Sequence, residues 1–383
     1  MARGVAVALV LLAACSFKSH EVAGGDAPRV DAPSIDTPTA GDGSGSGSGS
    51  AVGAYRKPIT IDKSHVHGSN TDFPVWIDLT DADIAMRAQT DGSDIFFTDS
   101  GGTTLDHELT FYSKGMQHLQ AWVRIPTLSM ANNTTIYVVY GDPARTVTPN
   151  PAGVFKASFG AVWHLDDALS AATVADATGT HPGTAIGLSA AAQVPGQLGG
   201  AFTFDGSGTH SVSFTNMLTG ANAHTISAWV NQASTTDHSP VLVVGAATTD
   251  GARFLYGNYL NSGTLGIGQY TDDWVPSSND LRGKNWKYVA YTLEGSNKKA
   301  HVFVDGTEIM GSPHTMNAAA NTTATTGLIG AAPTGFMAAE MNGLLDEVRI
   351  ATVQRAPGWV QTEFANQSAP GTFYAVGAEE LAP

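Results

Sequence analysis

The stretch His118-Leu119-Gln120-Ala121-Trp122-Val123-Arg124-Ile125 decides the fold class of the first folded region. Every second residue in it is apolar: Leu119, Ala121, Val123 and Ile125. Successive side chains of a β-strand point to opposite faces, so a period of two predicts a strand with one buried face. The stretch therefore predicts a half-buried strand of an antiparallel sheet.

Five further short apolar runs surround this strand and have strand lengths. They are Tyr55–Ile61, Phe73–Leu79, Ile95–Thr98, Leu109–Tyr112 and Thr135–Tyr140. Turn-forming residues, such as Thr90-Asp91-Gly92 and Ser100-Gly101-Gly102, separate neighbouring runs. Residues 54–150 are accordingly predicted to form a small antiparallel β-sandwich.

Residues 154–383 continue the strand pattern and predict a second β-domain. Ala300, Val302 and Val304 alternate with other residues before a turn at Gly306. Leu345, Val348 and Ile350 supply a late strand. Together with 43 Gly and 18 Pro in the chain, these patterns predict an all-β protein.

One helix is expected near the C-terminal end. Between Pro357 and Asn366 the apolar residues Trp359, Val360 and Phe364 share one helical face. We expect this helix to cap the second domain. The following run, Phe373 to Val376, is predicted as the last strand, which would close the core of that domain.

Both regions carry resemblances to known domain families. The first, through Asp94–Asp99, Ala121–Val123 and Ile136–Asp142, resembles an uncharacterised β-rich domain, a domain of unknown function seen beside LamG-like domains in bacterial surface proteins. That resemblance implies a fold and no activity. The second resembles the LamG, or concanavalin A-like, jelly roll through segments whose order and spacing extend from about 154 to 380. These segments are Val162–Asp166, Asp176–Gly179, Gly199–Gly206, Thr225–Val230, Trp286–Ala290, Val302–Gly306 and Gly343–Ile350.

Composition excludes two classes of protein. Of the 383 residues, 42% are hydrophobic and 14% are charged, which excludes wholesale disorder. The 19 basic residues against 34 acidic ones leave a net charge of -15, which repels phosphate backbones. Nucleic acid is therefore not an expected partner.

The first residues predict a secretory signal. Arg3 precedes an apolar run from Val5 to Ala14, which is too short for a membrane span of about 20 residues. Leu12-Ala13-Ala14-Cys15 resembles the bacterial lipobox, in which the cysteine receives a diacylglycerol and the peptide is cut just before it. Residues 1–14 are then the lipoprotein signal peptide, and the alternative is an ordinary signal peptide in which Cys15 is incidental.

Lipidation of Cys15 implies an address at the cell envelope. Several acyl chains anchor a protein durably where one chain is marginal. Ser16 follows the cysteine where an Asp would signal retention at the inner membrane, so an outer-membrane location is expected. Cys15 is the only cysteine, so the mature chain has no thiol left for a disulfide.

A tether is predicted between Cys15 and the first domain. Residues 15–53 contain Asp26-Ala27-Pro28, Asp31-Ala32-Pro33 and Asp36-Thr37-Pro38, followed by Gly-Ser alternation from Gly43 to Ser50. Pro-rich segments are extended spacers and Gly-Ser segments are flexible joints. The tether would let the two domains reach away from a membrane.

Catalytic chemistry is not predicted. Glycosidases need two carboxylates about 5 to 9.5 Å apart, and the strands show no paired display of acids. Asp346 and Glu347 are adjacent, so a regular strand would point them to opposite faces. No Gly-x-Ser-x-Gly elbow follows a strand. The open alternatives are a polysaccharide-acting enzyme with carboxylates in unrecognised positions and a purely structural surface protein.

The LamG resemblance implies a possible calcium site. Domains of this kind often bind Ca²⁺ through Asp side chains and backbone carbonyls. The candidate ligands are Asp176, in an Asp-x-x-Gly segment, and then Asp205 and Asp346. The alternative is that each Asp caps a turn.

Sugar binding is the other function considered for the second domain. Aromatic rings stack on sugar faces beside polar groups. The candidate ligand-binding residues are Trp274 with Asp272 and Asp273 in an expected loop, and Tyr256 and Tyr259 in the preceding hairpin. Trp274 could instead anchor its loop. The leading hypothesis is a lipid-anchored cell-envelope protein whose LamG-like domain recognises a carbohydrate or an envelope or extracellular protein, without catalysis.

Overall fold

The computed structural model describes residues 54–233, 238–249, 251–258, 264–276, 281–283, 285–336 and 340–383. The predicted signal peptide, Cys15, the tether and Tyr259 lie outside the described residues. Residues 50–383 belong to one unit, in which both predicted β-domains lie. Among the described residues, no helix is long and apolar enough to cross a membrane.

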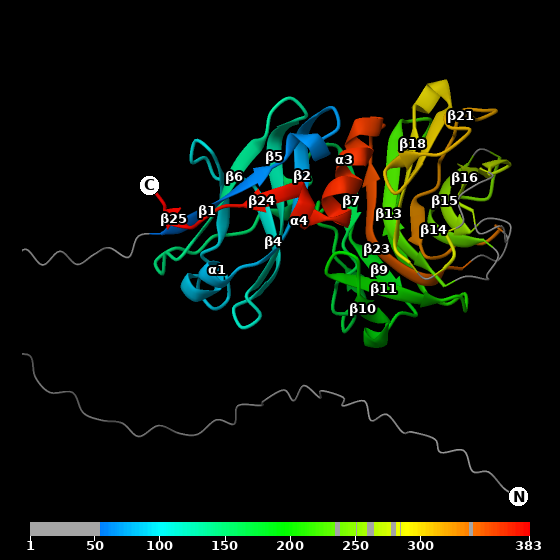
Figure 1. Ribbon diagram of the computed structural model, residues 1–383. Helices are drawn as coiled ribbons and strands as arrows, with labels where there is room; N and C mark the ends of the chain where they lie inside the picture. The colour runs from blue at the N-terminus through cyan, green and yellow to red at the C-terminus, as the bar shows by residue number, and fades with distance from the viewer. Residues whose placement is uncertain are drawn as a thin grey trace, which may run out of the picture. The chain divides into compact units, whose positions relative to one another are not determined.

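The first domain is an antiparallel sandwich of two sheets (Figure 1). One sheet has the order β24-β1-β6-β3 with β25 also paired to β1, and the other has the order β2-β5-β4. The strands contributed by the first part of the chain are β1 (Tyr55–Ile61), β2 (Ser69–Thr80), β3 (Phe96–Asp99), β4 (His107–Ser113), β5 (His118–Ser129) and β6 (Thr134–Tyr140). All six predicted strands are confirmed, within a few residues at their ends.

The core of this sandwich uses the alternation seen in the sequence. Leu119, Ala121, Val123 and Ile125 are all buried in it. Trp122, on the opposite face of β5, is also fully buried, in a second apolar cluster that includes residues of the jelly roll. On this second face only Trp122 is buried, because the jelly roll covers it, while His118, Gln120 and Arg124 are half-buried.

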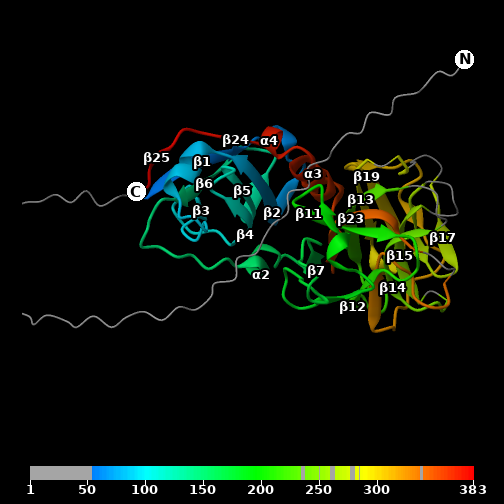
Figure 2. The same cartoon turned by 90° about the horizontal axis from the view of Figure 1, so that it is seen from below.

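The second domain is a jelly roll of two antiparallel sheets (Figures 1 and 2). The first sheet has the order β10-β11-β23-β13-β18-β19-β20, with β7 on β23 and β21 on β19, and the second has the order β17-β16-β15-β14-β22-β12-β9-β8. In the first sheet these are β7 (Phe159–Trp163), β10 (Gln193–Pro195), β11 (Gly200–Asp205), β13 (His224–Gln232), β18 (Lys287–Leu293), β19 (Lys299–Val304), β20 (Thr307–Glu308), β21 (His314–Thr315) and β23 (Asn342–Ala351). In the second sheet they are β8 (Thr173–Val174), β9 (Gly183–Ile186), β12 (Ser211–Thr215), β14 (Ser239–Gly245), β15 (Ala252–Asn258), β16 (Gly266–Gln269), β17 (Asp272–Trp274) and β22 (Thr326–Ile329).

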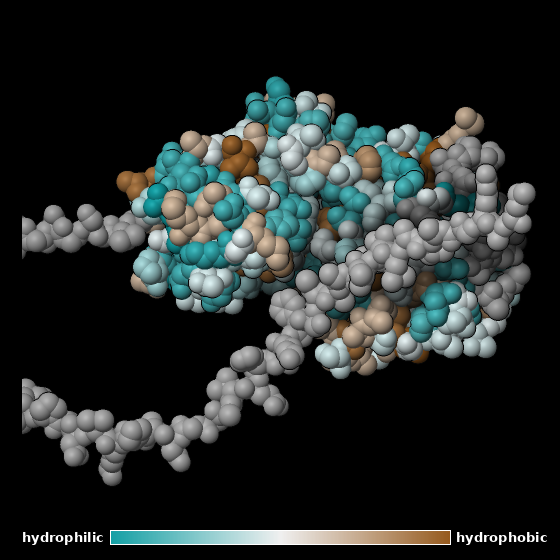
Figure 3. Space-filling model, turned by 60° about the horizontal axis from the view of Figure 1, so that its bottom comes forward, coloured by the Kyte–Doolittle hydropathy of each residue, from teal (hydrophilic) through white to brown (hydrophobic). Residues whose placement is uncertain are grey.

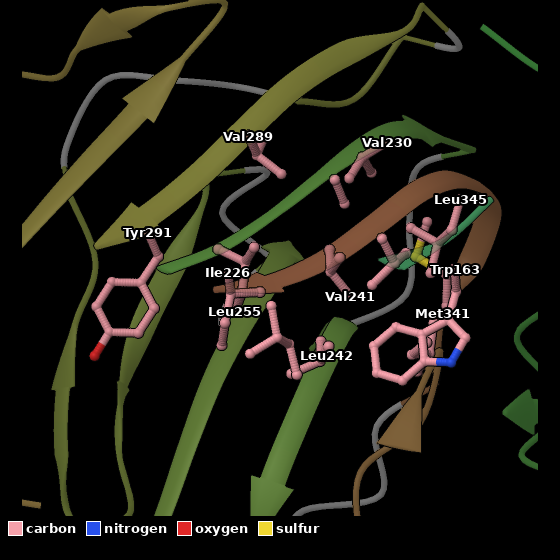
Figure 4. Close-up of a cluster of buried hydrophobic side chains, with 14 of the residues drawn as sticks. Trp163, Ile226, Val230, Val241, Leu242, Leu255, Val289, Tyr291, Met341 and Leu345 are labelled. Atoms are coloured by element: carbon pink, nitrogen blue, oxygen red, sulfur yellow. The ribbon is translucent and has the colours of Figure 1, made fainter. Parts of the chain in front are cut away.

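The jelly-roll core lies between these two sheets. Ile226 and Val289 from the first sheet meet Leu242 and Leu255 from the second, and all four are fully buried (Figure 4). On β13, the alternate residue Trp229 belongs instead to the cluster that contains Trp122. The outer face of the first jelly-roll sheet is therefore covered too.

The chain end returns to the first domain. After β23 come α3 (Pro357–Ser368), α4 (Pro370–Phe373), β24 (Tyr374–Val376) and β25 (Glu380–Leu381). Val376 pairs with Ile59 and Leu381 with Tyr55, and Phe373 is buried in the first core. The prediction that the run from Phe373 to Val376 closes the jelly roll was wrong, because β1 has an open edge at which this run pairs.

Helix α3, predicted over 357–366, lies between the two domains (Figure 2). Val360 and Phe364 pack with Trp229 in the shared cluster. On the other side, the N–H of Trp76 in the edge strand β2 donates to Oδ1 of Asn366 at 2.7 Å, and Nδ2 of Asn366 donates to the Trp76 carbonyl at 3.0 Å. The helix thus satisfies backbone groups that an open sheet edge leaves unpaired.

Two short α-helices and three 3₁₀ segments are the other helical elements of the described chain. Asp81 caps α1 (Ala82–Arg87) and Asn150 caps α2 (Pro151–Val154) by accepting hydrogen bonds from N–H groups of the first turn. The 3₁₀ segments are η1 (Lys63–His65), η2 (Ala190–Ala192) and η3 (Gly295–Asn297).

Candidate ligand-binding cleft

A β-bulge in β23 organises the region between the domains. Leu345 and Val348 both point into the jelly-roll core although they are three residues apart, an odd spacing that a regular strand forbids. The pairing with β13 shifts between Ser227 and Trp229, and Glu347 has a φ of 50°. One extra residue is inserted at this point, so the alternation of side chains is reset.

The bulge turns both adjacent acids away from the jelly-roll core. Asp346 Oδ2 accepts hydrogen bonds from the N–H groups of Gln197 and Leu198, at 2.8 Å each. Glu347 Oε1 lies 2.6 Å from Nδ1 of His164. The expectation that these acids point to opposite faces of a strand was therefore wrong, since it assumed a regular strand.

His164 connects the domains by a polar contact. It follows β7, whose Trp163 pairs with Val348, and this register brings His164 opposite Glu347. Its other ring nitrogen, Nε2, lies 3.1 Å from Oε2 of Glu108 in the first sandwich. Burial lowers the pKa of His164, but the carboxylates of Glu347 and Glu108 outweigh burial and raise this pKa well above its usual value.

Arg349 extends the network behind His164. Its guanidinium donates to Oε2 of Glu347 at 2.7 Å and to Oε1 of Glu363 in α3 at 2.5 Å. Glu363 also accepts from the Tyr288 hydroxyl at 2.9 Å. Arg349, Glu347 and Tyr288 are all buried, and the paired charges compensate one another.

The two neighbouring acids of β23 have opposite pKa shifts. Burial, and then repulsion from Glu347, raise the pKa of Asp346 well above its usual value. Burial would also raise the pKa of Glu347, but attraction to His164 and Arg349 outweighs it and lowers that pKa. Asp346 therefore favours its protonated form while Glu347 stays ionised.

Aromatic side chains from the first sandwich line this region. Trp76 and Trp122 are paired residues on β2 and β5, with ring centroids 4.9 Å apart. The guanidinium of Arg349 lies 4.4 Å from the centroid of Trp122, and the ring of His164 is nearly parallel to this indole. The charged network is thus packed against an aromatic surface.

A cleft of about 520 Å³ opens beside this network. The first sandwich contributes Trp76, Thr110, Phe111, His118, Gln120 and Trp122, and the jelly roll contributes His164, Asp166, Gln193, Glu347 and residues 196–200. The outward-facing residues of β5 and the turn that joins β10 to β11 therefore form its opposite walls. The side of the molecule seen in Figure 3 is mainly hydrophilic, and its hydrophobic residues form small separate patches.

Several groups in the cleft are available to a ligand. Phe111 is 37% exposed and lies beside His118, with ring centroids 5.5 Å apart. Asp166 is exposed, and its carboxylate makes no hydrogen bond or ion pair with the described residues. The indole Nε1 of Trp122 is buried and has no hydrogen-bond partner in the described part of the chain. The cleft thus offers an aromatic face and an acceptor, whereas the Trp122 donor lies beneath its surface.

The predicted sugar-binding residues do not line this cleft. Trp274 lies in the strand β17 and not in a loop; it is half-buried and stacks on His314, with ring centroids 5.0 Å apart. Asp272 is buried and accepts a hydrogen bond from Nδ2 of Asn317 at 2.8 Å, whereas Asp273 is exposed. Tyr256 lies in β15, and nothing is described of its side chain. These contacts favour the anchoring role for Trp274, and its role in binding stays a prediction.

The three predicted calcium ligands have separate surroundings. Asp205 accepts from the N–H of Ser207 and pairs with His210, while Asp346 holds the turn at Gln197 and Leu198. The carboxylate of Asp176 accepts hydrogen bonds from four backbone N–H groups and one hydroxyl, those of Val162, Thr178, Thr180 and His181. Within the described ranges, no three His, Cys, Asp or Glu side chains converge as metal ligands. Calcium binding stays a prediction.

Sequence reasoning missed the cleft, although one signal for it was present. The sequence predicts Leu345 and Val348 in one late strand, and if both face the core, their odd spacing requires a bulge at Asp346 or Glu347. No comparable signal indicated that Gln120 and Trp122 would face the segment at Gln197. That contact depends on how the two domains pack.

The fold and this shared cleft define a two-domain β-protein of a recognisable class. Residues 91–169 match the family model described as domain of unknown function DUF2341, and residues 205–361 match that of the concanavalin A-like lectin/glucanases superfamily, of laminin G type. The chain therefore carries a DUF2341 domain followed by a LamG-like, concanavalin A-like domain. The name of the superfamily covers both lectins and glucanases, so membership alone does not decide between binding and catalysis.

Similar solved structures include carbohydrate-active proteins. Domain 4 of AbnA, an extracellular arabinanase from Geobacillus stearothermophilus, in complex with arabinotriose, is 20% identical with a TM-score of 0.40, over 54% of this chain and 98% of that one. A Trypanosoma rangeli sialidase is 16% identical with a TM-score of 0.42, over 55% of this chain and 33% of that one. None of the curated proteins matches the sequence significantly. Likenesses this distant say nothing about the ligand of this chain.

Proposed function

We propose that this chain is a lipid-anchored cell-envelope protein that binds carbohydrate without transforming it, in the cleft between its two domains. The observation that carries the proposal is the composition of the cleft walls. An exposed aromatic ring, Phe111, lies in the same cleft as the free carboxylate of Asp166 and the side chains of Gln193 and Gln197. Sugars offer an apolar face to rings and hydroxyls to such polar groups.

The size of the cleft suits a short saccharide. Its volume of about 520 Å³ lies within the range of roughly 300 to 1,000 Å³ that is typical of small-molecule sites. The residues behind its wall are held by buried ion pairs and aromatic contacts. A cleft whose walls are already ordered loses little entropy on binding.

A polysaccharide-acting enzyme is the second candidate. One observation favours it: Glu347 lines the cleft, and it and the neighbouring acid Asp346 have pKa values shifted in opposite directions, as in acid–base pairs. Against it, both acids are buried, and Asp346 Oδ2 and both oxygens of Glu347 are engaged by protein donors. We therefore assign these acids to holding the cleft wall and not to catalysis.

Membrane attachment at Cys15 is part of the proposal. The lipobox resemblance and the Pro-rich and Gly-Ser tether support an anchored, outward-reaching protein, and Ser16 supports the outer membrane. Mass spectrometry of the mature N-terminus should find a lipidated cysteine, and Cys15→Ser should move the protein from the detergent phase to the aqueous phase. An unmodified mature N-terminus would overturn the anchor without affecting the cleft.

Binding to a glycan array, followed by calorimetry, tests the cleft. We expect Phe111→Ala to weaken binding of a hit at least tenfold, because the exposed ring is removed, and Trp274→Ala to leave affinity within about twofold. The reverse pattern would move the site to the predicted Trp274 region. Release of reducing ends from any polysaccharide would favour the enzyme, and capture of an envelope protein without glycan binding would favour the protein-ligand alternative.

A further inference from the structure

We infer that the cleft selects a sugar carrying a free amino group over its N-acetylated or acidic counterparts, with Asp166 as the group that receives the ammonium. This inference rests on the proposed function of the cleft and names the ligand chemistry that its walls favour. Three features of the cleft support it: the carboxylate of Asp166 has no partner among the described residues, its main chain is held in place, and the surrounding charge is negative.

Asp166 is the uncommitted acid of the cleft wall. Its carboxylate makes no hydrogen bond or ion pair with the part of the chain that the structure describes, whereas Glu347 is engaged by His164 and Arg349. Although water reaches Asp166, the surrounding protein raises the pKa of its carboxyl more than attraction to His164 lowers it. A cation bound here would supply the partner that this carboxylate lacks.

The position of Asp166 is fixed by its neighbours. Nε2 of Gln193 donates to its main-chain carbonyl at 2.6 Å. Gly200, at the start of β11, approaches it so closely that a Cβ there would lie 2.8 Å from the Cβ of Asp166. Because these contacts constrain the main chain and Cβ of Asp166, its side chain starts from a fixed point on the cleft wall before any ligand arrives.

The charge balance of the cleft region is negative. Among the described residues, His164 and Arg349 are already paired with the three acids Glu108, Glu347 and Glu363, and His118, which also lines the cleft, pairs with Asp78. Asp166 adds a further negative charge, and the lining residues that the structure describes include no lysine or arginine. An acidic sugar would therefore meet repulsion without a cation to receive it, while an ammonium would meet attraction.

The hydrogen-bonding capacity of the Asp166 carboxylate also favours an ammonium group. An ammonium has three donors and no acceptor, so it matches a carboxylate with free lone pairs. Acetylation removes the positive charge and most of these donors. A divalent cation is a poorer match, because within the described residues no three acidic or histidine ligands converge.

Calorimetry of the full chain at pH 6 with four oligosaccharides of equal length tests the inference. The probes are a glucosamine oligomer, its N-acetylated form, a glucose oligomer and a glucuronate oligomer. We expect the glucosamine oligomer to bind about five- to tenfold more tightly than the two neutral probes, the N-acetylated and the glucose oligomers. This ratio is the one expected of a single, partly enclosed pair of charges. The glucuronate oligomer should bind most weakly. Asp166→Asn should abolish the preference for the amine, so that the glucosamine and glucose oligomers bind this variant with equal affinity.

Asp205→Asn is the matched control, since it removes one exposed negative charge outside the cleft. An asparagine there can still accept the hydrogen bond that Ser207 N–H donates to Asp205. This variant should keep the amine preference, which excludes an effect of overall charge. Equal or weaker binding of the amine form overturns this inference alone, whereas no binding of any of the four oligomers, nor of any glycan on the array, overturns the proposed function as well.

Discussion

Nε2 of His164, in the jelly roll, lies 3.1 Å from Oε2 of Glu108, in the first sandwich. The other nitrogen of the same ring lies 2.6 Å from Glu347, so one histidine is held between carboxylates of two domains. The ring is buried, and the contact therefore depends on its positive charge. It couples the packing of the domains to the protonation of a single side chain.

The first prediction concerns pH. Because the pKa of His164 is raised on folding, its charged contacts stabilise the fold fully below the unfolded value of about 6.5, and this stabilisation is lost as pH rises through the folded pKa. We expect His164→Gln to cost more stability at pH 6 than at pH 10, measured by urea unfolding. A loss of stability in His164→Gln that does not change with pH would contradict a positively charged His164 in the folded protein.

His224 provides a control in which the pH dependence of stability has the opposite sign to that at His164. It is buried, no acidic side chain pairs with it in the described part of the chain, and burial lowers its pKa to about 3. Because the buried ring resists protonation, the folded natural chain loses stability as the pH falls below the unfolded pKa of about 6.5. Glutamine does not titrate, so the His224→Gln variant should be more stable than the natural chain at acidic pH.

The second prediction concerns Arg349. Replacing it with Leu leaves the buried Glu363 without its cation and Glu347 with His164 alone, which should cost about 3 to 5 kcal/mol of unfolding free energy. Arg56→Ala, at the exposed pair with Glu380, should cost about 1 kcal/mol or less. Denaturant titration measures the unfolding free energy of both variants. Similar losses would show that burial of the Arg349 ion pairs does not increase their contribution to stability.

Asn366 is the subject of the third prediction. Asn366→Ala removes both hydrogen bonds to the backbone of Trp76 and leaves that buried edge unsatisfied, at a cost of about 1 to 3 kcal/mol. The exposed amide of Asn133 accepts one backbone N–H, and its Ala variant should lose much less. Thermal unfolding of both variants measures these losses of stability. Equal losses would contradict the role of α3 in satisfying the backbone groups at the edge of β2.

The fourth prediction tests the returning chain end. Removing residues 374–383 deletes β24 and β25, so hydrogen exchange should quicken in β1 and change little in β14. If the shortened chain does not fold, Tyr374→Phe serves instead, since its hydroxyl receives a hydrogen bond from the N–H of Asp78 at 2.7 Å. Faster exchange in the jelly roll than in the first sandwich would contradict the strand pairing.

The fifth prediction separates turn capping from calcium at Asp176. We expect Asp176→Ala to lose about 2 to 4 kcal/mol, because several backbone donors lose their acceptor, and to lose the same amount in EDTA. If EDTA lowers the melting temperature of the natural chain and not that of the variant, the calcium prediction holds instead.

Much of the secondary structure could be predicted from short-range patterns. The period of two in 118–125 and the turn residues beside each apolar run were sufficient for the six strands of the first sandwich. The cleft could not be predicted in this way. Phe111 and Asp166 face one cleft only because two domains pack together, and neither residue has a neighbour in sequence that indicates the other.

The prediction of lipidation at Cys15, the negative charge and the two all-β domains come from the sequence by itself, because they depend on local periodicity, composition and motif order. The tertiary structure decided which faces are covered, where the last strand pairs, and that Asp346 and Glu347 share a side. Local periodicity says only that a face is apolar and does not say what covers it. Contacts such as that between Asn366 and Trp76, 290 positions apart, arise from packing of the whole chain.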